Sequence, residues 1–406
     1  MTHVAPSPAG LRAGTAEFGR LQRALLGAAL AAFALLYCTQ PLLPAIGDSF
    51  GASPATASLT VSASTGALAL AILPLSGLAE SLGRIRLMRI GLVSACVLVL
   101  ASAAAPDLPI LLALRALVGV ALAAVVAVAM GHVGDEVHPA SVGSAMGVYV
   151  AGNSLGGVGG RLVSAAAGDG TSWRWGVLAV GLLSVLAIAL FSWRIPPAER
   201  FRPVPLRLAE QRRAVTGHLR DSAVVRLCLI AFLLMGGFVA SYNYLTYRLS
   251  HAPFRLSQGV IGLIFLAYLA GTATSAAAGR LADRFGRRGC LAAAIVITGA
   301  GLVLTLSDRL VLVILGLLVF TGGFFAAHAV ASGWVPRQVG TARAQASALY
   351  LLSYYAGSSV LGSLTGIAFS HGGWSATVAV VGGYTAMALV ITLSLSAGRP
   401  QQVRPS

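Results

Sequence analysis

The chain has 406 residues, of which 57% are hydrophobic and only 10% are charged. Its mean hydropathy is +0.84, well beyond that of soluble domains, so the composition indicates a polytopic membrane protein. The formal net charge of +16 comes from 28 arginines, since the chain contains no lysine.

Apolar runs of twenty or more residues recur along the chain, each long enough to cross a hydrocarbon core of about 30 Å. They predict an all-α fold, because strands of a membrane barrel would be shorter and would alternate in polarity. The predicted spans are 23–46, 57–79, 87–105, 108–131, 141–166, 173–194, 224–247, 258–281, 290–307, 309–335, 344–369 and 373–397. The predicted organisation is a tail at 1–22, six-helix bundles at 23–194 and 223–397, a linker at 195–222 and a tail at 398–406.

A charged motif follows the second span of each half: GLAESLGR begins at Gly77 and GRLADRFGR begins at Gly279, 202 residues later. Further on, SAMGVYVAGNSLGGVGG from Ser144 aligns with SALYLLSYYAGSSVLGS from Ser347, 203 residues later. Two places with nearly one offset predict a duplicated six-helix unit. Because six is even, the halves have the same orientation, related by an axis along the membrane normal.

The residues of this motif have predictable physical roles. Small residues at its start allow close helix approach, and the later glycines allow a tight reversal of the chain. The carboxylates can accept hydrogen bonds from a nearby helix start or pair with the arginines. Alternatively, the motif is a positively charged turn that only sets the topology. The presence of a second copy in the matching loop argues against this alternative. The motif residues for which we expect a role beyond topology are Gly77, Glu80, Gly83, Arg84, Gly279, Asp283, Gly286 and Arg287.

Two arginines, Arg115 and Arg161, lie inside predicted spans, whereas all 12 acidic residues fall in loops or at span ends. A charge inside a membrane is costly and usually faces a bundle interior or a water-filled cavity. The repeat places leucines opposite both arginines, so neither is repeated scaffold. We predict that Arg115 meets the negative end of a substrate, with a brace against backbone carbonyls as the rival. Arg161 lies near a span end, where snorkelling is the alternative.

Small residues at helical spacing predict close helix packing in the fifth and eighth spans. The positions are Gly152, Gly156, Gly160 and Gly271. Further polar residues inside spans are candidates for the lining of a substrate cavity. In addition to the two arginines, these are Tyr37, Gln40, Tyr242, Asn243, His328 and Tyr354. Gln40 and Asn243 are equivalent under the repeat, and His328 is a side chain that titrates near physiological pH.

The motif G-x-L-A-[DE]-x-x-G-R, present in both copies, resembles the signature of the major facilitator superfamily. RALVG at Arg115 is similar to the fourth-helix motif of that family, and the glycine-rich fifth span to that of its drug/proton antiporters, without the usual proline. YNYLTYR, HAVASGW and LYLLSYYAGSS look like one group of bacterial inner-membrane transport proteins. The resemblance implies the facilitator fold, alternating access, a latch in the motif loop and efflux by proton antiport.

Placing both termini in the cytoplasm puts 22 of the 28 arginines on cytoplasmic segments and 4 on external loops. This positive-inside asymmetry predicts a multi-pass protein of a bacterial-type inner membrane, with its basic loops against lipid head groups. Binding of nucleic acid is a poor explanation of the charge. The partners that we expect for this protein are a small-molecule substrate and membrane lipids, and we expect it to be a monomer.

The sequence also limits the energy sources that could drive transport. Without lysine there is no G-x-x-x-x-G-K-[ST] loop, so a nucleotide-driven motor of that type is excluded. Coupling to protons through His328 and passive facilitation both stay open, as does uptake of an anionic solute. We expect no cofactor and no metal, since the four cysteines form no C-x-x-C. A serine hydrolase built from G-x-S-x-G at Ser154 with His328 as base is disfavoured, because the motif lies in a predicted helix.

Overall fold

The structure, a computed structural model, describes residues 10–203, 208–339 and 342–395. These residues are almost entirely helical and contain no β-strand, only one isolated bridge between Leu11 and Val137. The predicted all-α fold is therefore confirmed. Part of the predicted tail at 1–22, linker residues 204–207 and the whole tail at 398–406 lie outside the described residues.

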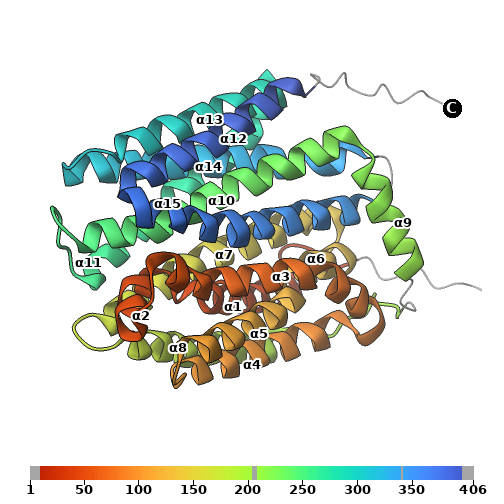
Figure 1. Cartoon of the computed structure of the whole chain (residues 1–406). Coiled ribbons are helices and arrows are strands. Elements are labelled where there is room, and N and C mark those ends of the chain that lie inside the picture. The colour runs from red at the N-terminus through yellow and green to blue at the C-terminus, as the bar shows by residue number, and fades with distance from the viewer. Residues whose placement is uncertain (1–9, 204–207, 340–341, 396–406) are drawn as a thin grey trace, which may run out of the picture.

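The first half of the chain forms eight α-helices and one 3-10 helix, which lie together (Figure 1). They are α1 (Ala16–Tyr37), η1 (Gln40–Leu42), α2 (Leu43–Phe50), α3 (Pro54–Leu82), α4 (Arg84–Ser102), α5 (Leu108–Val126), α6 (Ala129–Glu136), α7 (Pro139–Gly168) and α8 (Trp173–Arg194). We call these elements the first helical group. Polar caps start several of them: the side chains of Thr15, Ser53, Asp107 and Ser172 accept backbone N–H groups of the first turn, which otherwise lack a partner.

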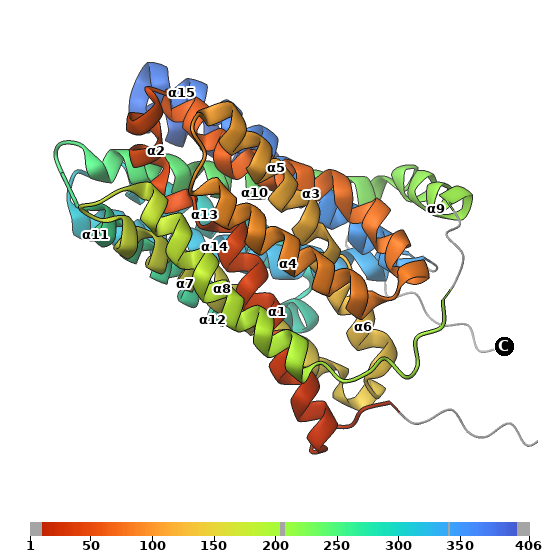
Figure 2. The same ribbon diagram turned by 90° about the horizontal axis from the view of Figure 1, so that it is seen from below.

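A short helix, α9 (Leu208–Leu219), precedes the second half. The elements that follow are α10 (Ser222–Ser250), α11 (Gln258–Gly262), η2 (Leu263–Leu266), α12 (Ala267–Phe285), α13 (Arg287–Leu304), α14 (Leu310–Gln338) and α15 (Arg343–Ser394). We call α10–α15 the second helical group. Figure 2 shows the long helices of both groups from below, with α9 at one end of the molecule.

Ten helical segments of the described residues are long and apolar enough to cross a membrane. One of them, the 52-residue α15, contains two spans, because Gly373 breaks the helix with φ 61° and ψ −148°. The 30-residue α7 is not among the ten, since its glycines and Arg161 make it less apolar. With α7 and both parts of α15 the described residues form twelve spanning segments. Outward side chains such as Leu186 and Val311 are 68% and 69% exposed, as expected where lipid is the solvent.

The two copies of the charged motif have the same backbone geometry. Gly83 ends α3 with φ 92° and Gly286 ends α12 with φ 91°, and the next helix begins at the following residue in both places. Side chains other than hydrogen are strained at such φ values. The predicted tight reversal is therefore present in both halves. A side chain on Gly279 would meet nothing within 4 Å, so the close helix approach predicted there is absent.

Close packing in the fifth span is confirmed. A Cβ added to Gly152, Gly156 or Gly160 would come within 2.7 Å, 2.4 Å and 2.5 Å of atoms of α1. At Gly271 the added atom would lie 2.6 Å from the Phe325 ring of α14. Small residues thus bring helix backbones together where lipid supplies no hydrophobic drive.

The two ends of the molecule differ, as Figure 1 shows. At one end lie α6, α9 and the segment 195–203, and we call this the linker end. At the opposite end, which we call the loop end, lie α2 and α11. The groups contact each other mainly through α3 against α15 and α7 against α11 and α12.

Candidate functional site

Polar contacts between the two helical groups lie on one side of the structure. Tyr244 donates to Ser58 over 3.0 Å, Ser363 to Ser62 over 2.6 Å, and Ser257 of the loop before α11 to Asp169 over 3.0 Å. In the part of the chain that the structure describes, every hydrogen bond between the groups uses a first-group residue from 40–65 or Asp169. No ion pair between residues of this described part joins the groups at the linker end. These hydrogen bonds thus hold the groups together in the half of the molecule next to the loop end.

Arg161 of α7 is at the centre of this fastening and is only 3% exposed. Its Nε donates to the Gln40 side-chain oxygen over 2.7 Å, and Nη1 donates to the carbonyl of Gly157 over 2.7 Å. The guanidinium carbon lies 4.3 Å, 5.0 Å and 4.9 Å from the ring centres of Tyr37, Phe265 and Tyr268. Snorkelling, the alternative considered from the sequence, is wrong in this structure, because the side chain points between the groups.

The amides Gln40 and Asn243, which are equivalent under the repeat, meet across the interface. Gln40 donates to the Asn243 side-chain oxygen over 2.8 Å. The nitrogen of Asn243 is buried without a hydrogen-bond partner among the described residues, which is costly in this state. We call Tyr37, Gln40, Arg161, Asn243, Phe265 and Tyr268 the Arg161 cluster.

Arg115 of α5 occupies a different environment and is 0% exposed. Its Nε donates to the carbonyl of Thr60 over 3.1 Å, Nη1 donates to that of Leu35 over 3.0 Å, and Nη2 donates to that of Leu36. The sulfur of Cys38 lies 3.8 Å from Nη1. All these partners belong to α1, its end and α3, within the first group. Arg115 therefore does not lie between the groups in this structure: its fork of donors braces three helices, which is the rival interpretation.

His328 of α14 lies in an aromatic cluster with Tyr350 and Tyr354 of α15. Its Nδ1 is 3.0 Å from the Tyr350 hydroxyl, and its ring centre is 4.6 Å from that of Tyr354. Further rings, from Phe324, Phe325 and Tyr268, follow one another at centroid distances of 5.6 Å up to the Arg161 cluster. Tyr242 closes that end, 5.0 Å from Tyr268 and 2.7 Å from the Thr321 hydroxyl. Aromatic side chains thus connect His328 to Arg161.

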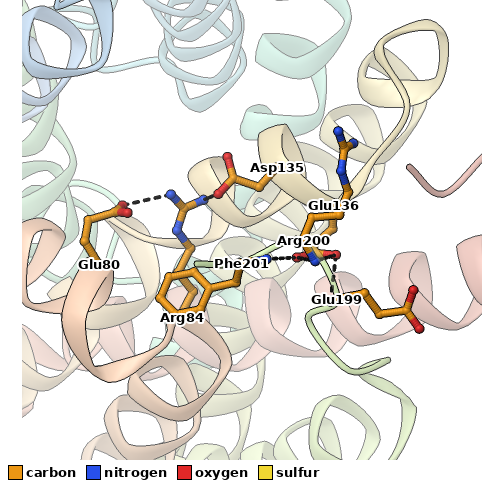
Figure 3. Close-up of polar contacts among 7 residues, drawn as sticks. All are labelled: Glu80, Arg84, Asp135, Glu136, Glu199, Arg200 and Phe201. Atoms are coloured by element: carbon orange, nitrogen blue, oxygen red, sulfur yellow. Dashed lines mark hydrogen bonds and ion pairs between the residues drawn. The ribbon is translucent and has the colours of Figure 1, made fainter. Parts of the chain in front are cut away.

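The carboxylates of the repeated motif form ion pairs inside each group. Arg84 pairs with Glu80 and with Asp135 of α6, each over 2.8 Å, and Asp283 pairs with Arg287 over 2.5 Å and Arg337 over 3.1 Å (Figure 3 shows the first set). Among the described residues, no helix-start N–H donates to Glu80 or Asp283, so that predicted role is wrong here. The acceptor of backbone N–H groups is Glu136, next to Asp135 (Figure 3).

Ser154 lies inside α7 and not at a strand-to-helix turn, and His328 contacts Tyr350. This geometry lacks the exposed serine and adjacent base of a nucleophile elbow. Sequence reasoning missed Phe265, Tyr268, Asp135 and Glu136. Two adjacent acids at the end of a span were a sequence signal that could have identified Asp135 and Glu136. No sequence pattern distinguished the rings of Phe265 and Tyr268.

Comparisons with known proteins agree with this architecture. A family model, the Major Facilitator Superfamily, matches residues 25–257 and 249–406. The uncharacterized MFS-type transporter YybF of Bacillus subtilis is 40% identical over 380 residues, covering 94% of this chain and 93% of that protein. The inner membrane transport protein YnfM of Escherichia coli is 42% identical over 384 residues, covering 94% and 91%. The predicted likeness to inner-membrane transport proteins is thereby confirmed.

Solved structures share the fold at low sequence identity. A point mutant of the nucleoside transporter NupG superposes with a TM-score of 0.76 at 15% identity, covering 92% of this chain and 99% of that chain. A bacterial homologue of the human lysosomal transporter Spinster, inward-facing and unoccupied, gives a TM-score of 0.72 at 16% identity, covering 94% and 95%.

Proposed function

The chain belongs to the major facilitator superfamily and is a non-enzymatic membrane transporter, and from this premise we propose that it moves a small organic anion by alternating access, with Arg161 meeting the negative end of the substrate. The transport path lies between the two helical groups of one chain, so a monomer suffices. The observation that carries the proposal is the burial of an unneutralised arginine where the groups meet.

The uneven distribution of contacts between the groups supports alternating access. Hydrogen bonds hold the groups together in the half next to the loop end, and the ion pairs of the described residues at the linker end stay within one group. In the proposed cycle this is the state closed at the loop end. Opening that end requires the Gln40–Asn243 hydrogen bond and the stacking of Arg161 on Phe265 and Tyr268 to break, so these contacts form the gate.

The substrate class follows from the partners of Arg161. Within the described residues its contacts are an amide, a carbonyl and three ring faces, and no carboxylate. Its Nη2 has no hydrogen-bond partner among these residues. At an effective dielectric of about 20, a unit charge 4 Å away interacts with an arginine by roughly 4 kcal/mol. About a third of that already favours an anion tenfold, whereas a cation would be repelled.

The orientation follows from the arginines. Of the 25 arginines among the described residues, 19 lie on segments at the linker end, so the positive-inside rule places the linker end in the cytoplasm of an inner-membrane protein. The state described here then faces the cytoplasm.

We base the proposed direction of transport and its proposed coupling to protons on different observations. The similarity of the glycine-rich α7 to drug/proton antiporters favours efflux driven by protons. His328 is the candidate proton carrier, because it is a titratable side chain connected through aromatic rings to the Arg161 cluster. Uptake or facilitated diffusion of an anion is the second candidate, favoured by the absence of carboxylates from the span interiors.

The test is counterflow of labelled organic anions in proteoliposomes, with and without a pH gradient. We expect Arg161→Gln to weaken binding of a transported anion about tenfold or more, and that of an uncharged analogue far less. Arg174→Gln is the matched control, since Arg174 also lies near the loop end but donates to the carbonyls of Ala103 and Ala105. Robust transport of a quaternary ammonium dye by the wild type would refute the anion proposal.

A further inference from the structure

The carboxylate of Glu136 makes contacts that neither the gate nor the ion pairs of the motif require. It lies at the end of α6, at the linker end, and is 5% exposed. Its Oε1 accepts the backbone N–H groups of Arg200 and Phe201, each over 3.1 Å. Its Oε2 accepts those of Glu199 over 3.1 Å and Arg200 over 3.3 Å. Figure 3 shows both oxygens facing this segment, while Asp135 points to Arg84.

The backbone around Glu136 holds a second distant segment. The carbonyl of Glu136 accepts the N–H of Leu11 over 2.8 Å, and the carbonyl of Leu11 accepts the N–H of His138 over 3.0 Å. The N–H of Ala13 donates to the Ser141 hydroxyl over 2.9 Å. Three segments therefore meet at Glu136: the start of the described chain, the α6–α7 connection and residues 199–201.

The segment 199–201 has no helix or strand to satisfy its backbone. The chain leaves α8 at Arg194, and residues 195–203 have no regular secondary structure. Three successive N–H groups aimed at one carboxylate form strong charge-assisted hydrogen bonds. Phe201 also lies beside the motif, because its ring is 4.0 Å from where a Cβ on Gly83 would be. Glu136 is therefore the group that holds the start of the linker on the first helical group.

The far end of the linker is held by the second group. Helix α9 packs against α10 and α15, and the His218 ring nitrogen is 3.1 Å from the carbonyl of Ala342. From Phe201 to Leu208 the chain has seven Cα–Cα steps, which reach at most about 25 Å. Without the Glu136 contacts the connection would begin after Pro196, which is buried, and its twelve Cα–Cα steps would reach at most about 43 Å.

We propose that Glu136 is a positioning residue that, by holding residues 199–201, sets the number of residues in the covalent connection between the two helical groups, and so limits how far they separate at the linker end. Only the limit on separation rests on the proposed alternating access. The hydrogen bonds that fasten the linker do not depend on it.

Hydrogen exchange of the full-length protein in lipid nanodiscs tests the fastening directly. Glu136→Gln keeps the shape of the side chain but replaces one of two accepting oxygens by a donor. We expect the amides of 199–201 to exchange about tenfold faster or more in this variant. Glu199→Gln is the matched control: it removes a charge nearby, and the Glu199 side chain points away from the Glu136 carboxylate (Figure 3). Wild-type exchange in Glu136→Gln would overturn the proposal.

Distances between spin labels test the limit on separation. Leu82 at the end of α3 and Phe285 at the end of α12 are 45% and 64% exposed, so Leu82→Cys and Phe285→Cys can carry labels in a chain without its native cysteines. We expect Glu136→Gln to extend the long edge of the distance distribution, and Glu199→Gln to leave it unchanged. Faster exchange without longer distances would overturn the limit. A single distance under all conditions in every variant would instead refute alternating access, while the exchange result stands.

Discussion

The contact between α1 and α7 allows a prediction whose magnitude follows from the structure. In Gly156→Ala the added Cβ would lie 2.4 Å from the carbonyl oxygen and 2.7 Å from the Cα of Leu30. Ordinary contact begins at 3.4 Å, so the two helices must separate by about 1 Å, the difference between 3.4 Å and 2.4 Å. Because the obstacle is backbone and not a flexible side chain, we expect a loss of about 1–3 kcal/mol in stability.

The matched control is Gly159→Ala, in the same helix. An added Cβ at Gly159 would meet nothing within 4 Å, and both substitutions gain the same helix propensity of about 1 kcal/mol. The difference between the two variants therefore isolates the clash. In thermal unfolding of the purified protein we expect Gly156→Ala to melt about 1–4 °C below Gly159→Ala. Equal melting temperatures would refute the close approach of α1 and α7 on which the estimate depends.

Three further predictions concern the arginine brace, the motif and the histidine. Arg115→Gln should lower stability by about 3 kcal/mol or more in thermal unfolding, because three buried carbonyls lose donors; unchanged stability would contradict the brace. Glu80→Gln and Asp283→Asn should impair transport in proteoliposomes but leave membrane insertion intact, because the Glu80–Arg84 and Asp283–Arg287 ion pairs are lost while the arginines remain; wild-type transport in both would reduce the motif to a topology signal. His328→Ala should abolish accumulation driven by a pH gradient and spare exchange of substrate; equal loss of both would indicate a structural role, and loss of neither would remove His328 from coupling.

The sequence by itself determined the features that depend on local pattern. Apolar length set the spanning helices, and the offsets of 202 and 203 residues revealed the repeat. Glycine at positions 83 and 286 predicted the reversals, because only glycine tolerates φ near 90° without strain. The repeat also paired Gln40 with Asn243, although nothing in it said that the two amides would touch.

Only the tertiary structure decided what each buried charge contacts. Arg115 and Arg161 are alike in sequence terms, each a lone cation in an apolar run. One is held by backbone carbonyls of its own group, and the other lies between the groups on Phe265 and Tyr268. Backbone carbonyls such as those that hold Arg115 have no sequence signature. The rings of Phe265 and Tyr268 lie about a hundred residues from Arg161 in the chain and contact it only when the helices pack. Glu136 shows the same limit, because its partners are the N–H groups of 199–201, which any residue except proline would supply.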